Sequence, residues 1–79
     1  MQTNQDTNID WREHIHSDPQ VLLGKPTIKR TRISVELILE LLALGWTREM
    51  IIESYPKVTD DDIKAVFLYL RDSIRQRKL

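Results

Sequence analysis

The sequence predicts a small, mainly α domain in which three helices of helix-turn-helix type follow a short extended or β arm. Two observations carry this prediction. Beyond residue 34 apolar residues recur at helical spacing, and two short links, residues 45–46 and 55–58, divide this half of the chain into three segments. Before residue 34 turn signals interrupt short apolar pieces, which is typical of extended segments. A generic three-helix bundle has the same layout, so the pattern fits both architectures.

The composition is that of a folded soluble domain. Its 79 residues are 41% hydrophobic and 30% charged, and 12 Lys and Arg balance 12 Asp and Glu. The absence of cysteine excludes disulfides and thiolate sites. The longest apolar stretch is far shorter than the ~20 residues that span a bilayer, and the polar start lacks the pattern of a secretory signal. We therefore expect no membrane contact and a cytoplasmic location.

The first part of the chain predicts a tail and an arm. Residues 1–10 are almost entirely polar, so we expect a flexible tail there and a single helical domain over residues 11–79. Between Trp11 and Ile33 the sequence contains two turn signals with proline. Beside them lie two pieces that we expect to be short strands or extended arms, residues 14–16 and 27–29.

Each of the three expected helices follows a residue whose hydroxyl can cap the first turn: Ser34, Thr47 and Thr59. Gly45 ends the first helix, which spans about residues 35–44, and Pro56 ends the second. Three acids at the start of the third helix favour its dipole. The apolar residues of that helix lie on one face, which we expect to enter the core: Ile63, Val66, Phe67, Leu70 and Ile74.

The first helix is apolar on almost every side. Only Glu36 and Glu40 are polar within residues 35–44. A helix of this kind needs cover in most directions, and two other helices and a short arm can hardly supply it in a monomer of this size. We therefore expect a homodimer whose interface includes this helix or the arm, with these candidate contacts: Leu37, Leu41 and Leu44.

No arrangement of residues predicts catalysis. His14 and His16 alternate along a possible strand, but the sequence offers no further cluster of metal ligands. Residues 24–27 differ from a phosphate-binding loop because a proline separates the lysine from the threonine. Glu36 and Glu40 lie four residues apart on one helix face, and we interpret them as a solvent-exposed stripe rather than as a general acid and base. We expect a protein that is not an enzyme and that holds no cofactor and no metal.

Basic residues give the better lead. Residues 19–32 contain no acid and four cations: Lys25, Lys29, Arg30 and Arg32. Such an arm can contact DNA phosphates beside a helix-turn-helix body, although a charged edge strand that resists aggregation has the same appearance. Arg71 and Arg75 form a second candidate patch, in a position that the helix dipole also favours. Because the carboxylates of residues 60–62 repel phosphates, we expect DNA to meet the arm or the end of the last helix.

Ordered motifs run through most of the chain: Ile15-His16-Ser17-Asp18-Pro19, Gly24-Lys25-Pro26-Thr27-Ile28, Thr31-Arg32-Ile33-Ser34-Val35 and Tyr55-Pro56-Lys57-Val58-Thr59. In these motifs, over about residues 13–70, the chain resembles the domain of unknown function family four-three-three. The resemblance implies a bacterial, helix-turn-helix-like antitoxin domain with a short strand arm, often dimeric. It also implies pairing with a toxin, commonly a PIN-type ribonuclease, and repression of the shared operon through operator DNA.

Two positions depart from that family. Relatives tend to carry glycine where this chain has Leu23 and Arg30. If those glycines serve backbone angles with positive φ, the geometry of the arm here is in question. Arg30 also adds a cation to the basic run.

Two functions are therefore expected. The first is a dimeric, antitoxin-like regulator that binds DNA through the basic residues. The second is an interaction module that binds and neutralises a toxin ribonuclease without contacting DNA. The zero net charge is compatible with both, because residues 19–32 carry four positive charges whereas residues 33–62 carry two cations and seven acids.

Overall fold

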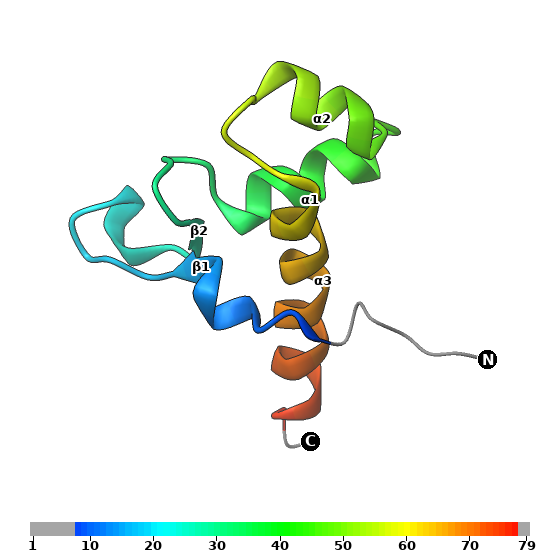
Figure 1. Cartoon of the computed structure of the whole chain (residues 1–79). Coiled ribbons are helices and arrows are strands. Elements are labelled where there is room, and N and C mark those ends of the chain that lie inside the picture. The colour runs from blue at the N-terminus through cyan, green and yellow to red at the C-terminus, as the bar shows by residue number, and fades with distance from the viewer. Residues whose placement is uncertain (1–7, 78–79) are drawn as a thin grey trace.

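The computed structural model describes residues 8–77 (Figure 1). It confirms the predicted fold class, because three helices follow a short antiparallel sheet of two strands. Along the chain the elements are the 3-10 turn η2 (Trp11–Glu13), β1 (Ile15–His16), the 3-10 turn η3 (Leu22–Gly24), β2 (Thr27–Ile28), α1 (Val35–Ala43), α2 (Arg48–Ser54) and α3 (Asp60–Arg75). In Figure 1, α1 crosses the upper end of α3, and α2 lies above α1.

Contacts with the domain begin earlier than the expected tail boundary. Residues 1–7 of that tail lie outside the described residues. Ile9, however, packs against the core. The carboxylate of Asp10 accepts a hydrogen bond from Arg12 N at 3.0 Å and so caps η2. The packed part of the chain therefore includes Ile9 and Asp10, two residues before the expected start at Trp11.

The arm is tied to the rest of the domain through its backbone. β1 and β2 pair with Ile15 opposite Ile28. On the other side of β2, Ile28 N donates to Ile33 O at 2.9 Å, and Val35 N donates to Pro26 O at 2.9 Å. Because β2 is bonded on both sides, the turn that follows it holds a defined position beside the first helix.

The three helices begin at the predicted caps. The hydroxyls of Ser34, Thr47 and Thr59 accept hydrogen bonds at 2.9, 3.1 and 3.1 Å from the backbone amides of Leu37, Met50 and Asp62. α1 ends one residue earlier than expected, and Gly45 follows it with a left-handed φ of 97°. α3 is the longest helix, with 16 residues. Within residues 8–77 no helix is long and apolar enough to cross a membrane.

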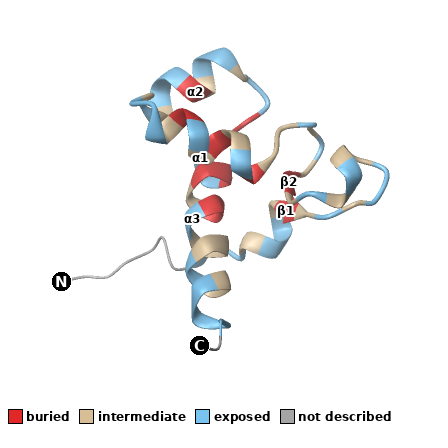
Figure 2. Ribbon diagram, turned by 180° about the vertical axis from the view of Figure 1, so that it is seen from behind, coloured by how far each residue is buried: buried red, intermediate tan, exposed pale blue. Residues whose placement is uncertain are grey.

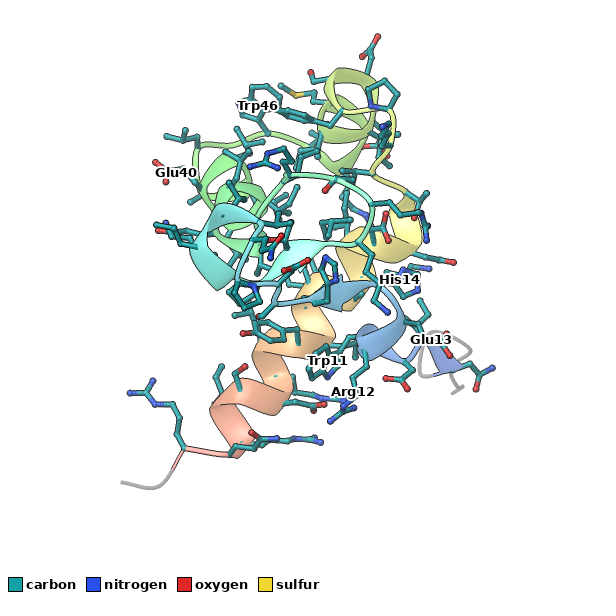
Figure 3. The ribbon with its side chains drawn as sticks, turned by 90° about the vertical axis from the view of Figure 1, so that its left-hand side faces the viewer. Trp11, Arg12, Glu13, His14, Glu40 and Trp46 are labelled. Carbon is teal, nitrogen blue, oxygen red and sulfur yellow. The ribbon has the colours of Figure 1, made fainter. Side chains whose placement is uncertain are left out.

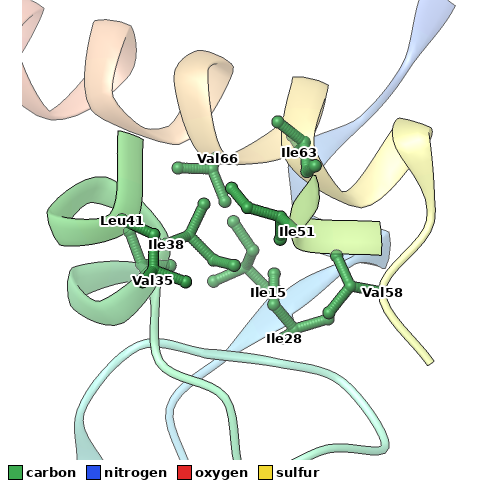
Figure 4. Packing of buried hydrophobic residues seen from close by; sticks show 10 residues of the cluster. Ile15, Ile28, Val35, Ile38, Leu41, Ile51, Val58, Ile63 and Val66 are labelled. Carbon is green, nitrogen blue, oxygen red and sulfur yellow. The ribbon is translucent and has the colours of Figure 1, made fainter. Parts of the chain in front are cut away.

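One core joins the arm to all three helices (Figure 4). Ile15 and Ile28 come from the two strands and are almost fully buried. Ile38, Ile51 and Ile63 come from the three helices and have no exposed surface. The arm is therefore part of the folded domain rather than an extension from it. The remaining buried apolar residues are Val35, Leu41, Val58, Ala65 and Val66.

The C-terminal half of α3 packs against the turn η2. The indole N–H of Trp11 donates to Oδ2 of Asp72 at 2.8 Å, and its ring meets Tyr69 edge-on, with centroids 4.9 Å apart. The guanidinium of Arg12 lies over the indole at 4.5 Å (Figure 3). These contacts place the start of the domain against its last helix.

Two expectations about apolar residues need correction. Leu41, a candidate dimer contact, is only 8% exposed and lies in the core of its own chain. Leu37 is half-buried, whereas Leu44 is 69% exposed. On α3, Phe67 and Ile74 do not enter the core and are 47% and 65% exposed. The buried residues of α3 form the face that meets α1 and the strands (Figure 2): Asp62, Ile63, Ala65 and Val66. At about 3.6 residues per turn, Phe67 and Ile74 lie to one side of that face.

Candidate nucleic-acid interface

An open cleft of about 570 Å³ separates the turn after β2 from the link between α2 and α3. The turn supplies residues 30–33, α2 supplies its last residue, Ser54, and the link supplies residues 55–57. His16 and Val21 complete the lining. We call this site the basic cleft, because among the described residues its charged side chains are cations: Arg30, Arg32 and Lys57.

The first wall of the basic cleft is a tight turn built around Thr31. Its hydroxyl donates to Ile28 O at 2.8 Å and accepts from Ile33 N at 3.0 Å. Its own amide donates to Ile28 O at 3.1 Å. Because these bonds fold the backbone back on itself, Arg30 and Arg32 stand on either side of Thr31 with exposed side chains.

The second wall is the short link that ends α2. Tyr55 N donates to Ile51 O at 2.8 Å, and Val58 N donates to Tyr55 O at 2.8 Å. Val58 is buried and fixes the link to the core. Pro56 and Lys57 lie between these anchors and are exposed, so the lysine is presented on a constrained loop.

The electrostatics of the basic cleft favour anions. No carboxylate lines it, and within residues 8–77 none of its three cations forms an ion pair. Guanidinium groups match phosphate oxygens with paired hydrogen bonds, and the lysine adds a point charge. The tyrosine ring, Val21, Ile33 and Pro56 give the cleft an apolar component as well. The arrangement suits a phosphate backbone with sugar or base surface beside it.

Lys57 was missed by the sequence analysis as a site residue. It lies 25 positions after Arg32, in a stretch that carries no other cation within three residues on either side. Lys57 drew attention only as part of the motif of residues 55–59, and that motif does not indicate that its charge lies at a site. The fold alone brings it to Arg30 and Arg32.

The other predicted basic residues lie elsewhere. Lys25 forms an ion pair with Glu36, with Nζ 3.5 Å from Oε1. Lys29 is half-buried beside the first strand and does not line the basic cleft. Arg71 contacts its neighbour Asp72, and Arg75 is exposed in the last turn of α3. Arg75 lies roughly 22 Å along the helix from Asp60, at 1.5 Å per residue, so it belongs to a separate surface.

Internal contacts occupy two of the three carboxylates at the start of α3. The guanidinium of Arg48 donates a hydrogen bond to Asp60, and Lys64 Nζ lies 3.6 Å from the other oxygen of that carboxylate. These cations, Arg48 first, lower the pKa of Asp60. Asp62 is buried under the arm. Asp61 alone of the three is exposed without an ion pair to a described residue, so repulsion of phosphates is weaker than the sequence suggested.

The two histidines lie at different sites. His14 contacts Asp62, whereas His16 lines the basic cleft. Within the described part of the chain no three His, Cys, Asp or Glu residues are grouped to hold a metal ion.

Both positions that the family resemblance singled out as departures adopt left-handed backbone. Leu23 has φ of 59°, and Arg30 has φ of 66°. A residue with a side chain pays about 1 kcal/mol or more for this conformation. The arm thus keeps the backbone geometry that glycine would adopt, and at Arg30 the strained position carries one of the cations of the basic cleft.

Comparisons with known proteins agree on one family. A family model described as "Protein of unknown function (DUF433)" matches residues 15–70. The fold is similar to the crystal structure of a DUF433 member protein from Anabaena variabilis ATCC 29413, with a TM-score of 0.71 and 27% sequence identity. That match covers 78% of this chain and 61% of the other, so this chain spans less than two thirds of that protein. No curated protein matches the sequence. Both walls of the basic cleft lie inside the matched residues.

Proposed function

The chain belongs to the DUF433 family, a family of unknown function, and from this premise we propose that it is a non-catalytic, antitoxin-like regulator that acts as a dimer and binds operator DNA. The observation that carries the proposal is the basic cleft. Arg30, Arg32 and Lys57 come from two segments that are distant in sequence, and they surround an open site that no carboxylate of the described residues lines. Phosphate contacts of this kind position a protein on DNA.

The position of α3 shapes how the protein would dock. Helix-turn-helix proteins commonly insert the first turn of their last helix into the major groove. Here that turn carries three acids, and Asp62 is covered by the arm. The basic cleft instead approaches the phosphate backbone from the side of the turn and the link. In a dimer, two such clefts would contact two half-sites related by the same two-fold axis.

The test is the salt dependence of DNA binding. Fluorescence anisotropy with a duplex from the region upstream of the gene gives the slope of log affinity against log salt. For each phosphate contact that is lost, this slope falls by about 0.9. Arg30→Ala, Arg32→Ala and Lys57→Ala each reduce the slope by about that amount.

Arg75→Ala is the matched control, because it removes an exposed cation from the far end of α3. We expect it to leave the slope unchanged. Absence of binding at low salt contradicts the proposed function. A loss in Arg75→Ala that is absent from the three cleft variants moves the DNA contact to the end of α3.

A second candidate function rests on the exposed apolar side chains of α3. Phe67 and Ile74 are seven residues apart and so lie on one face of the helix, two turns from each other. Such a face suits a protein partner, and in this reading the chain binds and neutralises a toxin ribonuclease without contacting DNA. Co-expression with a ribonuclease encoded by the adjacent gene tests it. Phe67→Ser and Ile74→Ser are expected to abolish co-purification, whereas Arg32→Ala is expected to preserve it.

A further inference from the structure

At the tip of the arm, Leu23 is exposed to solvent and has an unfavourable left-handed backbone conformation. Leu22, Leu23 and Gly24 are consecutive residues with φ of 51°, 59° and 84°. Left-handed backbone is unfavourable for the two leucines. Leu23 is 94% exposed, so packing against residues 8–77 does not offset that cost. An exposed apolar side chain in a strained conformation indicates a contact outside the chain.

A groove lies directly beside this leucine. It has a volume of about 440 Å³ and separates the tip of the arm from the start of α1. Its apolar walls are Leu22, Leu23 and Leu37. Lys25 and Arg32 stand at its rim, and Glu36 is paired with Lys25 at 3.5 Å. We call these six residues the leucine surface.

We propose that the leucine surface is the interface of a homodimer, in which Leu23 of each copy enters the groove of the other. The inference rests on the dimer of the proposed function and names the surface through which it forms. A two-fold interface requires one patch that is complementary to itself. The leucine surface meets this condition, because it holds a projecting side chain and a groove lined by leucines side by side.

The charges around the groove favour a second copy as the occupant. Each copy carries two cations, Lys25 and Arg32, and the carboxylate of Glu36 next to them. In the proposed two-fold dimer, Lys25 of one copy would face Glu36 of the other, and Arg32 would remain available to the basic cleft. Lys25 and Glu36 are both largely exposed in a single chain, so they are free to exchange partners across the interface.

The interface also connects with the DNA site. Arg32 lines the basic cleft and the groove. Pairing through the leucine surface would therefore bring the basic clefts of the two copies close to the dimer axis. This gives the dimer one basic face with two symmetrical sites rather than two remote ones.

Sedimentation equilibrium of the full chain without DNA tests the proposal. We expect the wild type to dimerise and Leu23→Gly to raise the dissociation constant about tenfold or more. Since glycine relieves the left-handed strain, the thermal midpoint of the Leu23→Gly monomer does not fall. Leu44→Ala is the matched control, because it removes another exposed leucine, at the other end of α1, and we expect it to leave the dissociation constant unchanged.

A charge exchange provides a second measurement. Lys25→Glu alone and Glu36→Lys alone place like charges across the axis and weaken association, whereas the double variant restores it. Restoration supports pairing through this rim. Equal weakening in the double variant contradicts it.

Two results overturn the inference. One is a wild type that stays monomeric at millimolar concentration. The other is a dimer that is unaffected by Leu23→Gly, and a loss of that dimer in Ile74→Ser would place the interface on α3 instead. Both results are measured without DNA. If the wild type binds no DNA but Leu23→Gly weakens the dimer, DNA binding is refuted and the interface is supported. If the cleft variants weaken DNA binding but Leu23→Gly leaves the dimer unchanged, DNA binding is supported and the interface is refuted.

Discussion

The imidazole Nδ1 of His14 lies 2.7 Å from Oδ1 of Asp62, and this hydrogen bond joins the arm to the first turn of α3. Asp62 is only 7% exposed. Its second oxygen accepts a hydrogen bond from Thr59 N at 2.9 Å, which completes the capping box of the helix. A single carboxylate thus begins the last helix and holds the arm against it.

Asp62→Ala is therefore expected to be strongly destabilising. It removes a cap and leaves the buried edge of His14 without its partner, so we expect the free energy of unfolding to fall by about 2 to 3 kcal/mol. His14→Ala costs about 1 kcal/mol, because the cap to Thr59 persists. Urea unfolding measures both variants. In a double-mutant cycle the two losses are not additive.

Asp61→Ala is the control for this prediction, since Asp61 is the exposed neighbour in the same turn. It is expected to change the free energy of unfolding by less than about 0.5 kcal/mol. Equal losses in Asp61→Ala and Asp62→Ala would show that only the helix dipole matters.

Acid weakens the fold partly through Asp72. The hydrogen bond from the indole of Trp11, followed by the neighbouring Arg71, lowers the pKa of Asp72. Because the folded state favours the charged carboxylate, its stabilisation is present above the unfolded pKa of about 3.9 and is lost as the pH falls through the lower, folded value. Urea midpoints measured from neutral pH to pH about 3 are expected to fall less steeply for Asp72→Asn than for the wild type.

Trp11→Phe is the matched variant, because it removes the indole donor and keeps an aromatic ring beside Tyr69. It is expected to reduce the acid dependence in the same direction. Parallel curves for the wild type and both variants would contradict the assignment to Asp72.

Arg30→Gly is expected to separate stability from binding. Glycine adopts the left-handed φ of this position without the steric cost of a side chain, although it loses more entropy on folding. The net result is a gain of about 0.5 kcal/mol in the free energy of unfolding. The same change removes a cation from the basic cleft, so the affinity for DNA and its salt slope both decrease.

Arg30→Ala distinguishes the two effects. It removes the cation but keeps the strained backbone, so it weakens DNA binding without raising the thermal midpoint. If Arg30→Gly and Arg30→Ala have the same midpoint, the left-handed turn is not a source of strain.

Local features of the fold could be predicted from the sequence. Ser34, Thr47 and Thr59 cap the three helices as expected, because each cap depends on a hydroxyl and an amide three residues away. The caps lie within one turn of the chain, so the surrounding fold is not needed to specify them. Leu23 and Arg30 adopt positive φ as well, but only the family resemblance, and not the local sequence, drew attention to these positions.

Features that depend on packing could not be predicted. Asp62 is buried and Asp61 is exposed, although the sequence presents two identical neighbours. Phe67 shares the apolar face of Ile63 but is 47% exposed, whereas its neighbour Val66 is fully buried. Lys57 joins Arg32 only because the link after α2 folds toward the turn after β2. In each case the burial or the neighbours of the residue depend on which other helix, strand or loop packs beside it, and the periodicity of the sequence does not specify this.

The bond between Trp11 and Asp72 has a consequence for the order of folding, because it joins residues that are 61 positions apart. A ribosome releases the N-terminal residues of this contact long before the C-terminal ones. The arm cannot close against α3 until that helix has been synthesised, and such long-range contacts slow folding. The start of the domain therefore closes against α3 only after Asp72 of that helix has been synthesised.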